Sequence, residues 1–346
     1  MGPHLFPSAP PLDVQAMEEA RARWATRAMP PGALGRVQDL AVHLAGIAGV
    51  CPPPVPRKPV VVVFAGDHGV VADGASAWPS EITAAMVATV SSGSAAISVF
   101  AEALGAPVVV VDVGVKTPLD PLPGVRTERV ADGTASIATG AAMTPSQAEA
   151  AVDIGTRIAS EQIEAGADCL IGGDLGIGNT TAAAALIGAF TGRSAVEVTG
   201  AGAGVPAGGI DHKRRLVAIA LERAEACAGP LDVLATVGGL EIAALAGFYI
   251  TAAEHRIPFI VDGVIAGAAL CAADALAPGT AAHAISGHRS SEPAASIVLD
   301  YLALDPLLDL QLRLGEGTGA CLAFPLVQSA ALALADMADL PEPGPA

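Results

Sequence analysis

The residues best suited to chemistry gather in a glycine-rich segment near the middle of the chain. Residues 172–181 read Gly-Gly-Asp-Leu-Gly-Ile-Gly-Asn-Thr-Thr and precede an alanine-rich stretch. If a strand enters this segment and a helix leaves it, capped by Asn179 or Thr180, free backbone N–H groups and the positive end of a helix dipole meet there. Such a site holds a phosphate, and Asp174 would accept hydrogen bonds from ribose hydroxyls. The segment is not a P-loop, because no Gly-Lys-Ser/Thr follows it. An ordinary glycine turn with a good N-cap explains the same residues equally well.

A second candidate is a carboxylate held between glycines. Residues 312–320 read Leu-Arg-Leu-Gly-Glu-Gly-Thr-Gly-Ala, just before an apolar helix-like stretch. In an apolar pocket, burial would raise the pKa of Glu316 and make it a general base. The alternative is that Glu316 is an acidic residue in the first turn of that helix, where the dipole favours it. On these residues alone, the alternative is the more common outcome.

A third segment combines hydroxyls, a cation and a carboxylate in one turn. Residues 286–293 read Ser-Gly-His-Arg-Ser-Ser-Glu-Pro. They suit phosphate or ribose binding, or they cap a helix, with Ser290 or Ser291 as the N-cap and Pro293 in the first turn.

Other candidates are weaker. The loop at 200–204, Gly-Ala-Gly-Ala-Gly, is expected at a further strand end, and Lys213 could reach a phosphate from the helix after this loop. A lone lysine is more often on the surface. Trp78, Met86 and Leu175 could contact a flat ligand, with core packing as the alternative.

Metal and redox chemistry find little support. Asp67 and His68 in Gly-Asp-His-Gly form an incomplete ligand set, so a structural turn or a substrate hydrogen bond is the better interpretation. The five cysteines lie far apart without a C-x-x-C pair. We therefore predict no metal, no cofactor and no disulfide scaffold, in a reducing compartment.

Short β-rich runs alternate with longer alanine-rich segments along the chain. These elements must position the candidate site residues. Strands are expected at 60–65, 108–114, 168–174, 258–263 and 283–287, and less securely at 231–237. Helices are expected at 80–92, 145–165, 180–190, 211–228, 240–254, 263–276, 292–303 and 319–335. Uninterrupted apolar strands joined by helices predict a doubly wound, mostly parallel sheet of Rossmann-like type, with ligands at the carboxyl ends of the strands. Residues 115–144 have no clear period and are expected to be an excursion.

The N-terminal region has a different pattern from the rest of the chain. Residues 13–50 have a helical pattern, and residues 51–59 contain five prolines that no helix tolerates. We place a domain boundary there.

Composition restricts the class of protein. Of 346 residues, 52% are hydrophobic and 15% charged, which supports a large core rather than disorder. The net charge of −17 argues against a nucleic-acid partner but leaves a nucleotide substrate possible. Uncharged stretches at 82–101 and 317–335 reach membrane-spanning length, but they contain polar residues or proline and lack basic flanks. We predict buried helices, no membrane partner, no signal peptide and a cytoplasmic location.

Taken together, these segments resemble the nicotinate-nucleotide–dimethylbenzimidazole phosphoribosyltransferase family, which makes the lower-ligand nucleotide of cobalamin. Six motifs occur in family order over about residues 60–335, and together they are specific although each alone is weak. They are Phe-Ala-Gly-Asp-His-Gly-Val at 64–70, Gly-Ile-Gly-Asn-Thr-Thr-Ala at 176–182, Val-Gly-Gly-Leu-Glu-Ile-Ala at 237–243, Val-Asp-Gly at 261–263, Gly-His-Arg-Ser at 287–290, and Leu-Arg-Leu-Gly-Glu-Gly-Thr-Gly at 312–319.

The resemblance implies a reaction without metal or cofactor. Nicotinate mononucleotide would give its 5-phosphoribosyl group to 5,6-dimethylbenzimidazole, and the products would be α-ribazole 5′-phosphate and nicotinate. By likeness, Glu316 is the general base. The nucleotide would be held by Asp174, Gly176, Ile177, Gly178, Asn179, Thr180, Gly202, Lys213, Ser290 and Ser291. The acceptor base would lie against Ser80, Met86, Leu175 and Leu314.

The resemblance also implies a homodimer whose subunit has a small helical module built from terminal segments. This divides the chain into a helical segment at 1–58, a doubly wound catalytic domain at 59–303, and the Glu316 loop with the C-terminal helix and tail at 304–346.

Several positions depart from the family pattern. Asp174 stands where the family commonly has glutamate, Ala85 replaces a glutamine, Ala201 and Ala203 replace an arginine and a threonine, and Pro-Ala-Ala at 293–295 replaces Pro-Gly-His. The alternatives are therefore a transferase that uses another base (a different benzimidazole, a purine or a phenolic compound) or a non-catalytic nucleotide-binding paralogue.

Overall fold

A parallel sheet organises the protein, as seen in a computed structural model that describes residues 6–202, 204 and 207–341. Its strands are β1 (Pro59–Gly66), β2 (Val108–Gly114), β3 (Val125–Thr127), β4 (Cys169–Leu175), β5 (Phe259–Val261) and β6 (Ala284–Ser286). All pairings among these strands are parallel, in the order β3-β2-β1-β4-β5-β6. This is the Rossmann order, and its switch point lies between β1 and β4, where ligands of such sheets bind. The predicted fold class is confirmed.

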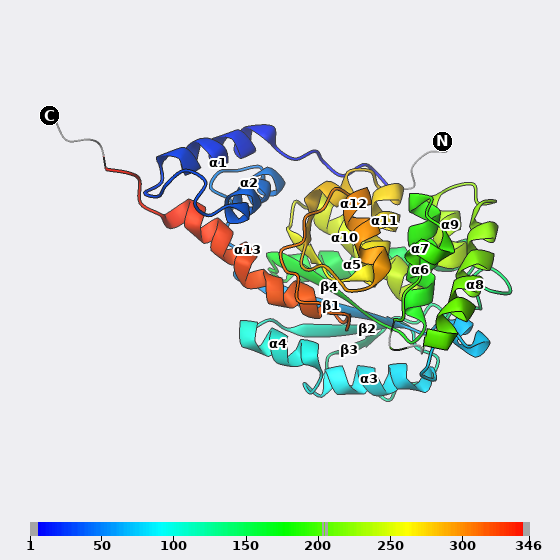
Figure 1. Ribbon diagram of the computed structural model, residues 1–346. Helices are drawn as coiled ribbons and strands as arrows, with labels where there is room; N and C mark the ends of the chain where they lie inside the picture. The colour runs from blue at the N-terminus through cyan, green and yellow to red at the C-terminus, as the bar shows by residue number, and fades with distance from the viewer. Residues whose placement is uncertain (1–5, 203, 205–206, 342–346) are drawn as a thin grey trace.

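Helices cover both faces of the sheet (Figure 1). They are α1 (Val14–Thr26), α2 (Arg36–Ala48), α3 (Glu81–Ser91), α4 (Ala96–Leu104), α5 (Pro145–Glu164), α6 (Asn179–Thr191), α7 (Ala195–Val198), α8 (Ala207–Ala224), α9 (Pro230–Val237), α10 (Leu240–Glu254), α11 (Val264–Leu276), α12 (Pro293–Tyr301) and α13 (Thr318–Asp336). The eight helices expected from the sequence are all present within a few residues of their predicted ends.

Strand β1 shows how the two layers share the sheet. Val60, Val62 and Phe64 belong to the core formed with α5, α6, α10 and α11. Val61 and Val63 belong to the core formed with α2, α3, α4 and α13. Successive side chains of a strand point to opposite faces, so an uninterrupted apolar run is what a strand buried on both sides requires.

Two predicted elements were wrong. Residues 231–237 form helix α9 rather than a strand, because Pro230 takes the first helical position and Leu234 and Val237 then face the core three residues apart. The sixth strand is instead β3, inside the segment 115–144 that was expected to be an excursion. The N-terminal pattern at 13–50 is two helices, α1 and α2, because Pro30, Pro31 and Gly32 interrupt it.

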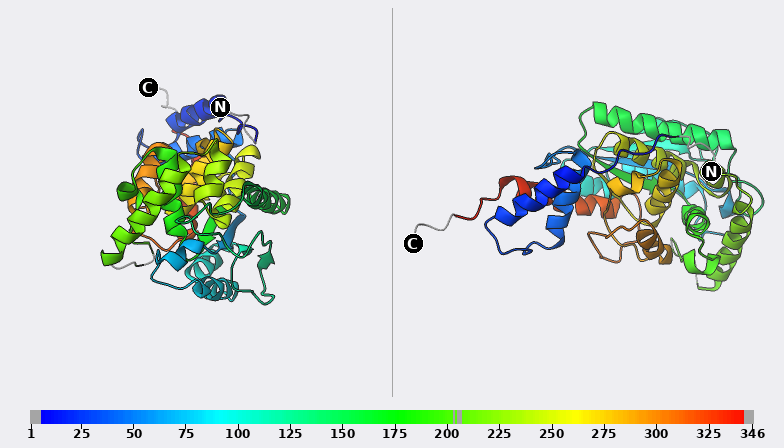
Figure 2. Two further views of the ribbon diagram at one scale, coloured as in Figure 1. Left: turned by 90° about the vertical axis from the view of Figure 1, so that its right-hand side faces the viewer. Right: turned by 90° about the horizontal axis from the view of Figure 1, so that it is seen from above.

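The first and last helices lie together at one end of the molecule. The C-terminal part of α13 reaches α1 and α2, well beyond the edge of the other helices (Figure 2). Arg27, after α1, donates hydrogen bonds to the carbonyl oxygen of Leu334 at 2.6 Å and to Asp339 at 3.0 Å. Residues 52–58, between α2 and β1, form neither helix nor strand, as their prolines predict.

In the part of the chain that the structure describes, two stretches are long and apolar enough to cross a membrane, judged by length and composition only: residues 81–104 and α13. The first is not one helix, because residues 92–95 divide it into α3 and α4. Helix α13 packs against α2, α4 and β5, and it contains Pro325. Both therefore have partners within the protein.

Candidate active site

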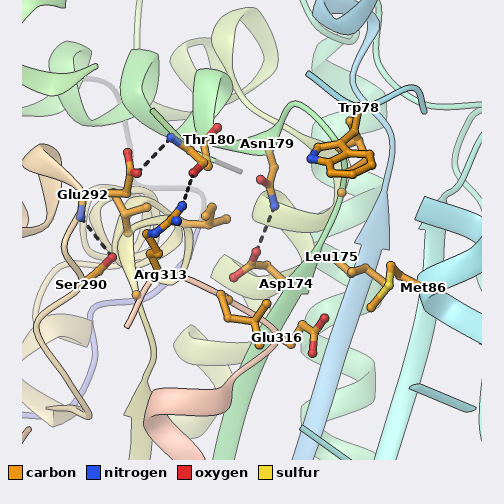
Figure 3. A pocket seen from close by; sticks show the side chains of 18 of the residues that line it. Trp78, Met86, Asp174, Leu175, Asn179, Thr180, Ser290, Glu292, Arg313 and Glu316 are labelled. Atoms are coloured by element: carbon orange, nitrogen blue, oxygen red, sulfur yellow. Dashed lines mark hydrogen bonds between the residues drawn. The ribbon is translucent and has the colours of Figure 1, made fainter. Parts of the chain in front are cut away.

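A pocket of about 390 Å³ opens at the carboxyl ends of β4, β5 and β6. Glu316 and the loop at 176–180 contribute to the same cavity, although they are far apart in sequence. The side chains around it are shown in Figure 3. The lining consists of Trp78, Ile82, Met86, Asp174, Leu175, Gly176, Ile177, Asn179, Thr180, Gly202, Gly263, Val264, Ile265, His288, Ser290, Glu292, Arg313, Leu314, Gly315 and Glu316.

Glycines bring the loop at 176–180 close to β1. A Cβ on Gly176 would lie 2.2 Å from the carbonyl oxygen of Gly66. Gly178 has φ +94° and is the N-cap of α6. The expectation that Asn179 or Thr180 caps this helix was wrong: both lie in its first turn and present the N-terminus of α6 to the pocket.

The side chain of Asn179 forms a hydrogen bond with Asp174 instead of capping the helix. Its Nδ2 donates to Oδ2 of Asp174 at 2.9 Å, and both side chains are buried (Figure 3). Within the described residues, Oδ1 of Asp174 has no hydrogen-bond partner. Burial raises the pKa of Asp174 well above its usual range, and the charges of Asp262 and Glu241 add to the rise. A neutral carboxyl at this position can donate as well as accept a hydrogen bond.

Glu316 lies in a strained turn before α13. Its φ is +63°, between Gly315 and Gly317, both with φ +85°. A Cβ on Gly173 would lie 2.4 Å from the carbonyl oxygen of Glu316, so glycine in β4 lets this turn pack on the sheet. The interpretation of Glu316 as a first-turn acid was wrong, because the N-cap of α13 is Gly317.

The environment of Glu316 suits a base. The residue is 4% exposed, and burial raises its pKa above the ordinary value. The backbone N–H of Ile97, at the start of α4, favours the ionised form, and the charge of Asp262 disfavours it. The net rise brings the carboxylate closer to the range in which it accepts a proton efficiently at neutral pH.

Lys213 lies behind the loop at 176–180 rather than on the surface. The residue is 1% exposed, and its Nζ donates to Oγ1 of Thr180 at 2.8 Å. Burial lowers its pKa to about 8, while Glu292 acts in the opposite direction. Gly202 approaches the same point, because a Cβ on it would lie 3.0 Å from Nζ of Lys213.

The loop at 200–204 does not end a strand, contrary to expectation. It follows the short helix α7. The N–H of Gly202 donates to Oε1 of Glu292 at 2.9 Å, and its carbonyl accepts from Nη1 of Arg313 at 3.2 Å (Figure 3). Ala203 lies outside the described residues. The loop therefore depends on side chains from the two other loops of the site.

The turn at 290–292 also differs from its prediction. Glu292, not Ser290 or Ser291, is the N-cap of α12, with Pro293 in the first helical position. Ser290 lines the pocket, and its hydroxyl accepts from the N–H of Glu292 at 3.4 Å. Ser291 is not among the lining residues described.

The other end of the pocket is apolar. Met86, Leu175 and Leu314 line it, as expected, together with Ile82 and Trp78. Leu314 and Trp78 are 57% and 51% exposed, so this end faces solvent. Ser80 precedes α3 and is not one of the described lining residues. Gly178 lies beside the pocket, in a small adjoining cavity.

Sequence reasoning missed several lining residues. Arg313 and Glu292 belong to two of the candidate segments, and their charge next to predicted site residues was an available signal. Ile82 lies one turn of α3 before Met86, on the same face, which was a second signal. Val264 and Ile265 begin α11, and nothing in their types distinguishes them from core residues.

His68 is structural, which agrees with the interpretation of its turn. Its Nε2 lies 2.6 Å from Oε1 of Glu241, and both side chains are fully buried. Burial opposes protonation of the ring, but Glu241 outweighs burial and raises the pKa of His68. Among the described residues, no three His, Cys, Asp or Glu side chains group in a way that could hold a metal ion.

The fold and the pocket define a class of protein when they are compared with known sequences. A family described as "Phosphoribosyltransferase" matches residues 9–344. A Rossmann-ordered sheet with a pocket and a helix N-terminus at the carboxyl ends of its strands is consistent with that class. The chain is a phosphoribosyltransferase.

Similar proteins specify the family. A nicotinate-nucleotide–dimethylbenzimidazole phosphoribosyltransferase of Salinispora tropica is 46% identical over 96% of both chains, and one of Chloroflexus aurantiacus is 45% identical over 96% of this chain and 95% of that protein. A crystal structure of CobT from Thermus thermophilus superposes with a TM-score of 0.91 at 46% identity, covering 94% of this chain and 97% of that chain. The chain belongs to the nicotinate-nucleotide–dimethylbenzimidazole phosphoribosyltransferase family, as the sequence motifs indicated.

Proposed function

We propose that this protein transfers the 5-phosphoribosyl group of nicotinate mononucleotide to 5,6-dimethylbenzimidazole or a related base, giving α-ribazole 5′-phosphate and nicotinate. The observation that carries the proposal is the convergence of Glu316 and the loop at 176–180 on one pocket. The names of the similar proteins supply the two substrates.

The pocket orients the nucleotide from its polar end. The phosphate binds at the N-terminus of α6, where Thr180 and the cation of Lys213 lie together. Asp174, next along the pocket wall, faces the ribose. This places the anomeric carbon toward the apolar end, between Asp174 and Glu316.

The acceptor base binds in the apolar end, against Met86, Leu175 and Leu314. One ring nitrogen attacks the anomeric carbon while the other gives its proton to Glu316. The bond between the anomeric carbon and the pyridinium nitrogen breaks, and its electron pair makes the ring of the departing nicotinate neutral. The leaving group therefore requires no strong acid. Direct attack inverts the anomeric centre from β to α. Most of the acceleration comes from holding the two reactants side by side.

The exchange of Glu316 for glutamine tests the base. Glu316→Gln keeps the shape of the side chain but cannot accept the proton, so kcat should fall by about 10²–10⁴-fold while KM for nicotinate mononucleotide changes little. Glu225→Gln, at an exposed site after α8, is the matched control. Nicotinate release, followed by chromatography, measures both. A Glu316→Gln enzyme with unchanged kcat would remove Glu316 from the role of base.

A transferase with another acceptor base is the second candidate, and the open apolar end of the pocket favours it. Leu314 and Trp78 are half exposed there, so rings of different outline can enter. We expect turnover with several benzimidazoles. A panel of benzimidazoles, purines and phenols, with products identified by mass spectrometry, decides which base gives the highest kcat/KM. Membership of an enzyme family and the intact Glu316 turn favour catalysis over a non-catalytic paralogue.

We also propose a homodimer, which the family resemblance implies, and a cytoplasmic location, which the scattered free cysteines favour. The division at residues 58 and 303 belongs to the same proposal. Sedimentation at several protein concentrations should give twice the chain mass, and a single monomeric species would contradict the dimer.

A further inference from the structure

Asp262 lies directly beneath the turn that carries Glu316. It follows β5, is 2% exposed, and accepts three backbone N–H groups from one short segment. Its Oδ1 accepts from Gly319 at 2.7 Å and from Ala320 at 3.0 Å, and its Oδ2 accepts from Gly317 at 3.3 Å. Asp262 therefore caps α13 from another part of the chain.

One of these contacts fixes the backbone of Glu316. The N–H of Gly317 belongs to the peptide group that follows Glu316, and the N–H of Glu316 itself donates to the carbonyl oxygen of Asp174 at 3.2 Å. The peptide groups on both sides of Glu316 are thus held while its φ is +63°, a conformation that a glutamate adopts only when its surroundings impose it.

His288 holds Asp262 in turn. Its Nε2 lies 3.3 Å from Oδ1 of Asp262, and both side chains are buried. A Cβ on Gly319 would lie 1.9 Å from the imidazole ring, so the ring packs closely against the start of α13. Burial lowers the pKa of His288, but the hydrogen bond and charge of Asp262, with smaller contributions from Arg289 and Asp309, raise it above the ordinary value.

We propose that Asp262, held by His288, is a positioning residue that fixes Glu316 in its reactive orientation. This inference rests on the proposed role of Glu316 as the base. The titratable groups coupled to Glu316 are Asp262, from the end of β5, and Asp174, from β4. Among the other elements, α4 contributes the N–H of Ile97, and His288 and uncharged Met86 line the same pocket.

Removal of the Asp262 carboxylate should move the pH profile of kcat. Asp262→Asn removes a negative charge near Glu316, so the pKa of Glu316 should fall and the acid limb should move to lower pH. His288→Gln takes away the ring that supports Asp262, so kcat should fall while KM for the nucleotide changes little. The profile is measured at saturating nucleotide and base, so that protonation of free substrate does not enter.

Asp262→Asn should also misplace the base, because an amide nitrogen cannot accept from the N–H of Gly317. We expect kcat to fall by about 10–100-fold, with KM for the nucleotide changed less than about threefold. In a Glu316→Gln background, Asp262→Asn should cause little additional loss, since its effect passes through the missing carboxylate. Asp13→Asn is the matched control, because Asp13 caps α1 from a carboxylate in the same way but lies far along the chain from the site.

If Asp262 only stabilises α13, Asp262→Asn will lower the melting temperature as Asp13→Asn does and leave kcat and its acid limb unchanged. That result would overturn the inference. So would an unchanged kcat in His288→Gln, which keeps the test decisive if Asp262→Asn fails to fold. The Glu316→Gln enzyme alone tests the proposed function, so the two failures are distinguishable.

Discussion

The proposed role of Lys213 in nucleotide binding comes with a cost in the stability of the fold. It is buried with its amine on Thr180, and its pKa of about 8 lies well below the ordinary 10.5. A folded-state pKa below the unfolded value means that the unfolded chain binds more protons between these two pH values, so this group makes the protein more stable as pH rises from about 8 to 10.5. Below this range, the buried charge opposes folding in full.

Lys213→Met should therefore weaken nucleotide binding without weakening the fold. We expect KM for nicotinate mononucleotide to rise by about 10²-fold, because the phosphate loses its cation. The variant should be more stable than the original chain at pH 7, by up to about 3 kcal/mol at 1.36 kcal/mol per pKa unit. The difference should shrink as pH approaches 10.5. Urea unfolding at about pH 7 and about pH 10 measures it; a variant less stable at the lower pH would contradict this explanation.

At the scale of residues, the sequence predicted chemical types better than contacts. Glu316 and the loop at 176–180 were identifiable because glycine next to a polar residue is a local signal. The partnership of Asn179 with Asp174 was not, since a helix cap is the usual role of asparagine before a helix. The burial of Lys213 also requires knowledge of what folds over it.

Among the elements, α5 and α10 make the closest helix contact. A Cβ on Gly155 would lie 1.7 Å from the carbonyl oxygen of Ala244, and one on Gly247 would lie 2.0 Å from that of Val152. The two backbones touch where each helix lacks a side chain. This contact fixes the position of α10. The first turn of α10 carries Glu241, which is bonded to His68.

Gly155→Ala should force these helices apart. Overpacking of this kind costs about 1–3 kcal/mol or more, although alanine favours the helix itself by about 1 kcal/mol. Gly208→Ala in α8, where a Cβ would meet nothing within 4 Å, is the control and should leave stability unchanged or increase it. Chemical denaturation of both variants gives the comparison. Equal stability for the two would show that α5 and α10 can separate freely.

The elements themselves were largely predictable. Five short apolar runs were correctly predicted as strands because they are bounded by glycine and are too short for helices. The prediction of a strand at 231–237 was wrong because Leu-Asp-Val-Leu-Ala-Thr-Val suits a helix as well as a strand. Pro230, at the first helical position, was the residue that indicated a helix. Strand β3 has three half-buried or exposed residues and no apolar run, so its position depends on pairing with β2.

At the scale of the molecule, Arg27 joins the two ends of the chain. It is 4% exposed, and its guanidinium group bonds to Leu334 and Asp339 in the C-terminal segment. A lysine presents one charged point rather than a fork. Arg27→Lys should therefore lose part of this set and destabilise the fold by about 1–3 kcal/mol. Differential scanning calorimetry should show a lower melting temperature than Arg21→Lys, an exposed change on α1; identical transitions would remove Arg27 from this role.

The architecture could be predicted because alternation of strands and helices leaves few topologies. The lengths of the terminal helices and their meeting point could not, because they depend on long-range contacts such as those of Arg27.

The position of Glu316 late in the sequence has a consequence for folding during translation. Protein synthesis proceeds from the N-terminus, and domains begin to fold as they emerge. The six strands described and the loop at 176–180 precede Glu316, and α13 follows it. In the proposed reaction, a chain whose synthesis stalls just before Glu316 would therefore contain the segments that bind the nucleotide but would still lack the base.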